Sequence, residues 1–264
     1  MRVLVTGGNG FLGSYICEEL QRQGHDLRLV LRRTSSTAFL NEVTYERVEG
    51  DIRDEAALRG ACEGVDAVVH CAGLTSALTE QQFQAVNGQG SAVLAAAAAE
   101  AGVSRYVYVS SLAVRGTGAP GEADAPSPLS AYGRSKLAGE VASLALQDRM
   151  SVAVVRPPVI YGPRDRGLLP FFKLIKLGIM PLYANGSNRL SWIHAQDAAS
   201  AIAAAVAGGP SGSVYTIADG EPHSWRELAA SLAKVMQRRR TLMLSVPPVL
   251  FTVAGQAAGF ASKA

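Results

Sequence analysis

Residues 2–6 (RVLVT) and 7–13 (GGNGFLG) decide the fold of this protein. The first stretch is a β-branched apolar run typical of a buried strand, and apolar residues recur at helical spacing from Phe11 to Leu20. A strand, a glycine-rich turn and a helix in this order are typical of the first unit of a dinucleotide-binding fold. We therefore predict such a unit at the start of the chain.

Three of the four glycines in residues 7–13 have a use in that fold. Gly7 permits the sharp turn, Gly10 lets the backbone approach a pyrophosphate, and Gly13 lets the helix pack closely on the strand. The helix that begins at Phe11 turns its free N–H groups and its positive dipole end toward the phosphates. Three glycines can also serve the turn alone, but their position directly after a buried strand favours nucleotide binding.

The chain has 264 residues, of which 48% are hydrophobic and 18% charged, with a net charge of +3. This composition predicts a globular protein with a substantial core, and the small charge gives no reason to expect nucleic-acid binding. The apolar runs are shorter than the roughly 18 residues of a membrane span, and Met1 leads straight into the first strand without a signal peptide. We expect a cytoplasmic protein without a metal site, with Cys17, Cys62 and Cys71 reduced.

Apolar runs alternate with helical patterns along the first 160 residues. The expected strands are residues 26–31, 44–49, 66–70, 105–110 and 151–156, and the expected helices are residues 55–63, 81–101 and 130–147. The alternation predicts an α/β fold with a doubly wound parallel sheet, a Rossmann fold. A loop rich in glycine, proline and acidic residues is expected at 116–128.

From residue 161 the pattern changes. We expect short helices near 168–176 and 196–207, a strand at 214–217, and a helix with a capping box at 224–227. We therefore divide the chain into a dinucleotide-binding domain at 1–160, which includes Ser111, Tyr132 and Lys136, and a small C-terminal substrate lobe at 161–264.

Two arginines, Arg32 and Arg33, stand just past the end of the second expected strand. A unit that binds NAD has an acidic residue near this position for the adenosine ribose. Guanidinium groups are suited instead to a 2′-phosphate, so we predict a preference for NADP, with NAD as the alternative. The other interpretation is a pair of solvated surface arginines.

Polar residues also follow the third and fourth expected strands. Asp51 can accept a hydrogen bond from an adenine amino group, whereas Asp54 has the position of a helix N-cap. His70 lies beside an apolar run, which favours a core histidine over a catalytic one. The small residues Ala72 and Gly73 then allow a cofactor to pass close by.

The most specific chemical signal is Tyr132 with Lys136, four residues apart on one face of an expected helix, and Ser111 upstream. An ammonium close to a phenol lowers the pKa of the phenol from about 10 towards neutral pH, so that the phenol can give or take a proton. A serine hydroxyl at the end of the fifth strand would hold the substrate oxygen beside it. This trio suits hydride transfer at carbon with proton transfer at oxygen.

In their order, these motifs resemble the extended short-chain dehydrogenases/reductases, the superfamily of NAD-dependent epimerases and dehydratases. The resemblance covers residues 1 to about 235. It rests on residues 6–13 (TGGNGFLG), 51–54 (DIRD), 70–73 (HCAG), Asn87, 110–111 (SS), 132–136 (YGRSK), 156–163 (RPPVIYGP) and 192–197 (WIHAQD).

By this resemblance Ser111, Tyr132 and Lys136 are catalytic, and Lys136 also binds the nicotinamide ribose. The resemblance implies that the cofactor is held by Gly7, Gly10, Phe11 and Leu12 at the pyrophosphate, Asp51 and Ile52 at adenine, Ala72 on the adenosine side, and Pro157 to Val159 at the nicotinamide end. We count Gly13, Arg32, Arg33, Gly73, Asn87 and also Tyr132 with these cofactor-binding residues.

Departures from the family pattern narrow the expected activity. The family's 4,6-dehydratases have an Asp-Glu pair after the catalytic serine or threonine, where this chain has Leu112 and Ala113. Nucleotide-sugar epimerases usually have an arginine where this chain has Leu190, with Arg189 one residue early. The resemblance is therefore stronger to the branch of dihydroflavonol reductases and 3β-hydroxysteroid dehydrogenases, whose substrates are uncharged ketones or alcohols.

We predict an oxidoreductase that transfers hydride between NADP and a carbonyl or secondary alcohol of a small molecule. The alternatives are a nucleotide-sugar epimerase and a non-catalytic NADP-binding regulator. Homodimers are common in the family. The apolar residues 246–260 lie near the end of a chain that is shorter than usual for it, and we expect them to pack on the lobe, with a dimer contact or a membrane-surface contact as alternatives.

Overall fold

The computed structural model describes residues 1–116, 126–183, 186–237 and 242–246. The chain divides into two compact units. The first consists of Met1–Ile160 and His194–Ile217, and the second of Tyr161–Ile193 and the described residues from Ala218 onward. The predicted loop at 116–128 and the apolar stretch at 246–260 lie largely outside the described residues, so the predictions for them stay predictions.

A seven-stranded sheet in the order β11-β6-β5-β4-β1-β2-β3 forms the centre of the first unit. Every neighbouring pair in it is parallel. Its strands are β1 (Arg2–Thr6), β2 (Asp26–Leu31), β3 (Tyr45–Glu49), β4 (Ala67–His70), β5 (Arg105–Val109), β6 (Ser151–Arg156) and β11 (Ser213–Thr216). The predicted doubly wound parallel sheet is confirmed.

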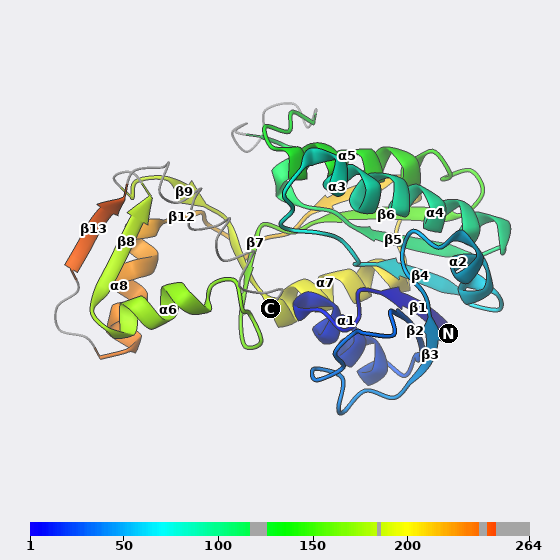
Figure 1. The fold of residues 1–264 in the computed structure, drawn as a ribbon, viewed down its shortest axis with the longest axis horizontal. Coiled ribbons are helices and arrows are strands. Elements are labelled where there is room, and N and C mark those ends of the chain that lie inside the picture. Colours follow the sequence, from blue (N-terminus) through cyan, green and yellow to red (C-terminus); the bar gives the residue numbers. More distant parts are fainter. Residues whose placement is uncertain (117–125, 184–185, 238–241, 247–264) are drawn as a thin grey trace. The chain divides into compact units, whose positions relative to one another are not determined.

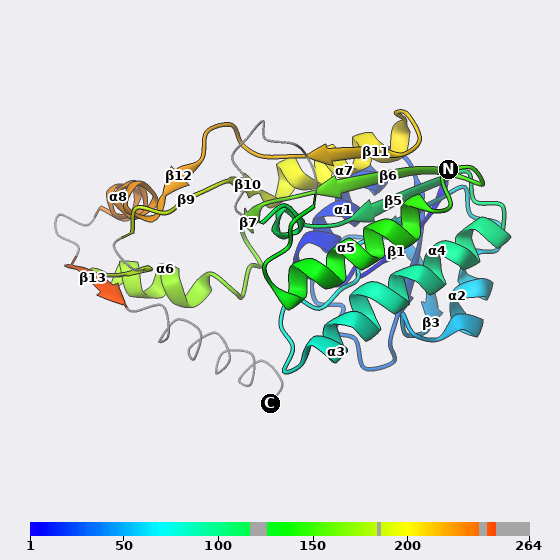
Figure 2. The ribbon, with the colours of Figure 1, turned by 90° about the horizontal axis from the view of Figure 1, so that it is seen from above.

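Helices cover both faces of this sheet (Figures 1 and 2). On one face α1 (Phe11–Arg22) packs against α7 (Ala195–Ala207), and on the other α4 (Ser91–Glu100) packs between α2 (Glu55–Cys62) and α5 (Ala131–Leu144). Apolar residues of β4, β5 and β6 are almost fully buried between the two layers. Small residues allow close approach: a Cβ at Gly139 of α5 would lie 2.2 Å from the Tyr108 hydroxyl on β5.

The strand order reverses between β1 and β4. From β1 the sheet grows through β2 to β3 in one direction, and from β4 through β5 to β6 in the other. Ligands of open parallel sheets bind in the crevice at the carboxyl ends of the strands where this reversal occurs. The glycine turn after β1 and residues 71–74 after β4 both lie at this point.

The expected helix at 81–101 is interrupted. The structure has α3 (Glu80–Phe83), a π-helical segment η1 (Gln84–Gly90) and then α4. Asn87 in η1 directs its side chain to Leu74 and to Ser135 of α5, and its carbonyl oxygen accepts a hydrogen bond from the Ser91 hydroxyl. The partners of the Asn87 side chain are far away in the sequence, so the local pattern contains no sign of them. It therefore predicts an uninterrupted α-helix there.

The first unit also includes residues 194–217, which the division predicted at residue 160 assigns to the substrate lobe. β7 (Val159–Tyr161) carries the chain out of this unit and β10 (Trp192–His194) brings it back. Helix α7 then packs on α1, and β11 pairs with β6 at the edge of the sheet. The helix predicted at 196–207 and the strand predicted at 214–217 therefore belong to the first unit.

The second unit has its own small core. In it β8 (Ile179–Tyr183) pairs with β13 (Leu242–Val246), β9 (Arg189–Leu190) pairs with β12 (His223–Ser224), and the helices are α6 (Leu169–Lys176) and α8 (Trp225–Val235). The core residues are Ile175, Met180, Leu182 and Ala229. The predicted capping box is confirmed, because Ser224 and Glu227 each accept a hydrogen bond from the backbone N–H of the other.

Among the described residues, no helix combines the length and the apolar character needed to cross a membrane.

Replacing Gly13 by Ala is expected to lower the free energy of unfolding by about 1–3 kcal/mol. The added Cβ would lie 2.0 Å from the carbonyl oxygen of Gly7, a backbone atom that can move only if the turn opens. Gly60→Ala is the matched control, because this exposed glycine of α2 has nothing within 4 Å of a new Cβ. The control should gain up to about 1 kcal/mol from helix propensity. Urea unfolding of the two variants tests this, and similar changes in both would contradict it.

Candidate functional site

The glycine turn after β1 has the geometry of a phosphate cradle. Gly7 has a left-handed φ of +73°, and its carbonyl oxygen accepts a hydrogen bond of 3.0 Å from the Gly10 N–H. Helix α1 begins at Phe11 without a capping side chain, so the N–H groups of Phe11 and Leu12 have no partner from a cap. A first helical turn that presents free N–H groups fits a pyrophosphate. The residues present therefore fit a dinucleotide cofactor.

The loop after β2 is joined to this turn. The Asn9 side chain donates a hydrogen bond of 3.1 Å to the Ser36 carbonyl oxygen. Arg32 and Arg33 are exposed directly after β2, and Arg47 of β3 donates to the Arg32 carbonyl oxygen at 3.0 Å. The two predicted arginines are thus exposed residues at the end of the strand that neighbours β1.

The residues predicted around adenine follow β3. Asp51 accepts hydrogen bonds from both the backbone and the guanidinium of Arg53, and these bonds hold the pKa of the Asp51 carboxyl below its ordinary value. Asp54 caps α2 by accepting from the Ala57 N–H at 3.1 Å, which confirms its predicted structural role. Ile52 packs against Gly90 of the π-helical segment.

Residues 71–74 after β4 lie between the residues predicted on the adenosine side and Lys136, the lysine predicted to be catalytic. The Ala72 N–H donates to the Thr6 hydroxyl at 3.3 Å. A Cβ at Gly73 would lie 3.0 Å from the Asn87 amide oxygen and 3.8 Å from the Lys136 ammonium nitrogen. The amide of Asn87 is occupied by Leu74 and Ser135, so its predicted contact with a cofactor stays a prediction.

Helix α5 places Tyr132 and Lys136 on consecutive turns. Ser130 caps the helix by accepting from the Gly133 N–H at 3.0 Å, which fixes the turn that carries Tyr132. The Lys136 side chain is buried, donates to the Val109 carbonyl oxygen at 2.7 Å and lies 4.3 Å from the centre of the Tyr108 ring. Burial acts to lower the pKa of Lys136, but the neighbouring phenol oxygens of Tyr108 and Tyr132 outweigh it and leave the pKa raised.

Ser111 follows β5 and caps the short 3-10 helix η2 (Leu112–Val114). Its hydroxyl oxygen accepts from the Ala113 N–H at 3.2 Å. The Leu112 N–H in turn donates to the Pro157 carbonyl oxygen at 2.9 Å. The segment of Ser111 is therefore joined directly to the segment predicted to hold the nicotinamide end.

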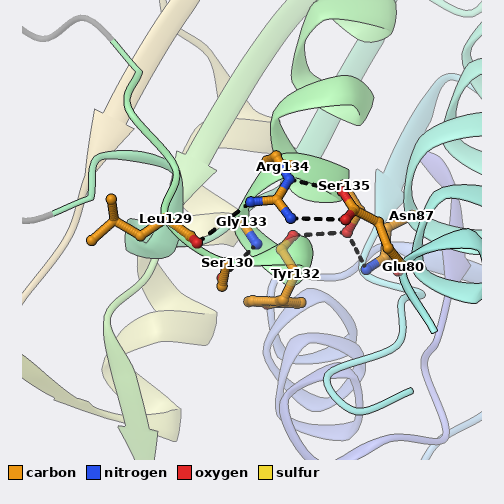
Figure 3. A network of polar contacts seen from close by, with 8 residues as sticks. All are labelled: Glu80, Asn87, Leu129, Ser130, Tyr132, Gly133, Arg134 and Ser135. Carbon is orange, nitrogen blue, oxygen red and sulfur yellow. Dashed lines mark hydrogen bonds and ion pairs between the residues drawn. The ribbon is translucent and has the colours of Figure 1, made fainter. Parts of the chain in front are cut away.

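Figure 3 shows the polar contacts that hold the first turn of α5. Arg134 forms a bidentate ion pair with Glu80 of α3 at 2.7 and 2.8 Å, and Ser135 donates to the Tyr132 carbonyl oxygen at 2.7 Å. The Tyr132 ring also meets the Phe83 ring edge-on at 5.9 Å between centroids. Contacts from α3 and η1 therefore hold the first turn of α5 in place.

A family model described as "NAD dependent epimerase/dehydratase family" matches residues 3–218, which include all of the geometry above. The chain belongs to this family. It is an enzyme of the extended short-chain dehydrogenase/reductase type, as the resemblance of its motifs implies.

Relatives within the family carry names of different reactions. The ceramide reductase of Caulobacter vibrioides is 34% identical over 253 residues, which is 95% of this chain and 75% of that protein. The structure of a dTDP-glucose 4,6-dehydratase from Streptomyces venezuelae with NAD bound matches with a TM-score of 0.83 at 31% identity, covering 94% of this chain and 84% of that one. That of the UDP-glucose 4-epimerase of Thermus thermophilus with NAD has a TM-score of 0.82 at 27% identity, with coverages of 94% and 87%.

Sequence reasoning missed a buried ion pair close in the chain to the residues predicted to be catalytic. Arg156, at the end of β6, donates to Glu140 of α5 at 2.8 and 2.6 Å, and the Ser110 hydroxyl donates to the same carboxylate. All three residues are buried. The pair joins the segments that precede Ser111 and Pro157 to the helix that carries Lys136. The signal available in the sequence was the position of Glu140, one helical turn after Lys136.

His70 is a hydrogen-bonded core histidine, as predicted. Its two ring nitrogens lie 2.7 Å from the Thr6 hydroxyl and 2.8 Å from the Ser91 hydroxyl. Burial, together with the positive charge of Lys136, lowers the pKa of His70 to about 3. The three cysteines are free thiols, with Cys17 and Cys62 buried and Cys71 partly exposed. Within the described part of the chain, no cluster of three or more acidic, histidine or cysteine side chains is arranged to hold a metal ion.

Proposed function

We propose that this enzyme is an oxidoreductase that moves hydride between a nicotinamide cofactor, NADP in preference to NAD, and a carbonyl or secondary alcohol of an uncharged small molecule. The observation that carries the proposal is the placement of Tyr132 and the buried Lys136 on consecutive turns of α5, with Gly73 beside Lys136. When bound, the cofactor supplies or accepts the hydride.

Residues of the chain itself would transfer the proton and bind the substrate oxygen. Tyr132 would donate a proton to that oxygen during reduction and take it back during oxidation. Lys136 would hold its positive charge near the phenol and donate to the ribose hydroxyls, and Ser111 would donate a hydrogen bond to the same substrate oxygen. The first turn of α1 would hold the pyrophosphate with Gly7 and Gly10, with Pro157 and Val159 at the nicotinamide end.

The neighbours of Ser111 support reduction over dehydration. A dehydratase needs an acid and a base to eliminate water, whereas Leu112 and Ala113 offer neither. Arg189 forms an ion pair of 3.6 Å with Glu227 and donates to the Pro222 carbonyl oxygen, so its charge is already partnered. A nucleotide-sugar epimerase is the second candidate, and the observation in its favour is the structural match to a UDP-glucose epimerase.

A paired assay separates the candidates. The purified protein is given NADPH with a pool of ketones and, separately, with a pool of nucleotide sugars, while cofactor absorbance and product mass are followed together. Consumption of NADPH with a ketone reduced by two hydrogen atoms supports the proposal. An isomerised sugar with an unchanged cofactor signal identifies an epimerase. Binding of NADPH without turnover in either pool favours the NADP-binding regulator.

The cofactor preference has its own test. Arg32→Ala and Arg33→Ala are each expected to raise the KM for NADPH by roughly tenfold or more, because a hydrogen bond between charged groups contributes about 1.5–3 kcal/mol. The KM for NADH should change little, since NADH has no 2′-phosphate. Arg22→Ala, at the far end of α1 and paired with Glu19, is the matched control and should change neither value. Equal increases of both KM values in the Arg32 and Arg33 variants would contradict the assignment.

A further inference from the structure

A continuous chain of hydrogen bonds runs through the buried space between β1, β4 and the start of α4. It begins at the Ala72 N–H, which donates to Thr6 Oγ1 at 3.3 Å, and continues over 2.7 Å to His70 Nδ1. From His70 Nε2 it passes over 2.8 Å to Ser91 Oγ, which donates to the Asn87 carbonyl oxygen at 2.6 Å. Thr6, His70, Ser91 and Asn87 are all buried, so water does not compete for these bonds.

The two ends of the chain fix its direction. A carbonyl oxygen only accepts, so the Ser91 hydroxyl must donate to Asn87, and Ser91 Oγ must then accept from His70 Nε2–H. Nδ1 of a neutral imidazole is then bare and accepts from the Thr6 hydroxyl, whose oxygen accepts from Ala72. Each donor has one acceptor, and the tautomer with the proton on Nε2 follows from the geometry.

Asn87 connects this chain to the turn of α5 that carries Tyr132: the chain ends at the Asn87 backbone carbonyl, and the Asn87 side-chain amide makes a second set of bonds. The Asn87 amide accepts from the Leu74 N–H at 2.7 Å and donates to the Leu74 carbonyl oxygen at 2.9 Å and to Ser135 Oγ at 3.0 Å. Ser135 donates to the Tyr132 carbonyl oxygen at 2.7 Å, in the network of Figure 3. Residues 72–74 are therefore joined to the turn of Tyr132 through Asn87 in two ways: the chain through His70 holds the Asn87 backbone, and the Asn87 amide bonds Leu74 and Ser135.

We propose that His70 is a positioning residue, which holds the loop after β4 and the Tyr132 turn of α5 in one mutual arrangement through this directed chain. The loop approaches the Lys136 ammonium nitrogen, so a shift at either end would change the distance between the cofactor side and the phenol. A misplacement of about 1 Å can cost roughly 10²-fold in rate. The role of Tyr132 in this inference rests on the proposed function, whereas the chain itself does not.

Two variants of His70 each keep one half of the chain. In His70→Asn the shorter side chain can accept from Thr6 but does not reach Ser91. In His70→Gln the longer amide can donate to Ser91 but loses the acceptor for Thr6. We expect His70→Asn to lower kcat by roughly tenfold to 10²-fold with a smaller change in NADPH affinity. His70→Gln should weaken NADPH binding more than it lowers kcat.

Two buried serines give a matched control. Ser91 and Ser143 both donate to a carbonyl oxygen four residues earlier, Ser143 to Gly139 at 2.8 Å, but only Ser91 belongs to the chain. Ser91→Ala should lower kcat by about tenfold and Ser143→Ala by less than about twofold, with similar losses of stability in urea. Equal effects of Ser91→Ala and Ser143→Ala on kcat would overturn the positioning role. So would a loss of stability in both His70 variants if one does not mainly lower kcat and the other mainly weaken NADPH binding.

The tautomer supplies a readout that needs no turnover. In the wild-type protein, ¹⁵N NMR of the His70 ring should show the proton on Nε2, and a proton on Nδ1 would overturn the chain as drawn. Fluorescence titration with NADPH then measures cofactor affinity in each variant. If no ketone is reduced, the proposed function fails while the tautomer and the NADPH affinities still decide whether His70 orders the loop.

Discussion

Tyr132→Phe is expected to lower kcat for ketone reduction by about 10²–10⁴-fold and to leave NADPH affinity unchanged. The range is what a positioned general acid contributes. The variant loses only the phenol oxygen, because the contact of the ring with Phe83 and the hydrogen bond from Ser135 to the residue 132 carbonyl do not involve that oxygen. Lys136 also keeps its bond to Val109. Steady-state kinetics and fluorescence titration with NADPH measure the two quantities.

The matched control for this substitution is Tyr45→Phe. Tyr45 lies on β3, at the edge of the sheet away from α5, so loss of its hydroxyl should leave kcat at the wild-type value. Turnover retained in Tyr132→Phe would remove Tyr132 as the general acid and with it the proposed mechanism. A loss of NADPH binding in the same variant would show that the phenol contributes mainly to the cofactor binding also predicted for Tyr132.

The sequence predicts best those elements whose ends are set by residues within or directly beside them. β1, β2 and β6 have the predicted bounds because each is a short apolar run closed by a glycine, charged or proline residue. The turn at Gly7 and the caps at Asp54 and Ser224 were likewise visible, since the residue types that these positions require are few.

Features set by distant contacts were not predictable in this way. The π-helical segment depends on what the Asn87 amide meets across the chain, at Leu74 and Ser135. Helix α7 belongs to the first unit because it packs on α1, and β11 because it pairs with β6, yet nothing local distinguishes an alanine-rich helix of one unit from that of another. The predicted division at residue 160 therefore missed the return of residues 194–217.

The same distinction holds within the candidate site. Tyr132 and Lys136 stand four apart on one helix, so their spacing alone places them together. Glu140 and Arg156 come from different elements, and each resembles an ordinary surface charge until the structure shows that both side chains are almost fully buried. His70 was predicted as a core residue, but its partners Thr6 and Ser91 come from other elements.

Glu140→Gln is expected to lower the free energy of unfolding by about 3–5 kcal/mol, the usual cost of leaving one charge of a buried pair without its partner. The Arg156 side chain is 5% exposed, so water cannot replace the lost carboxylate. Because the pair joins the ends of β5 and β6 to α5, kcat should fall as well in the fraction that remains folded. Urea unfolding measures the first effect and kinetics below the unfolding transition the second.

Two controls show whether burial is the cause. Glu80→Gln breaks the bidentate pair with Arg134, whose geometry is similar but whose side chains are almost half exposed, so its loss of stability should be far smaller. Glu140→Met combined with Arg156→Met removes both buried charges and should be more stable than Glu140→Gln alone, since neither charge is then left unpaired. If Glu140→Gln is no less stable than Glu80→Gln, the ion pair does not hold β5, β6 and α5 together. The placement of Ser111 and Lys136 would then depend on the hydrogen bonds of η2 and Val109 instead.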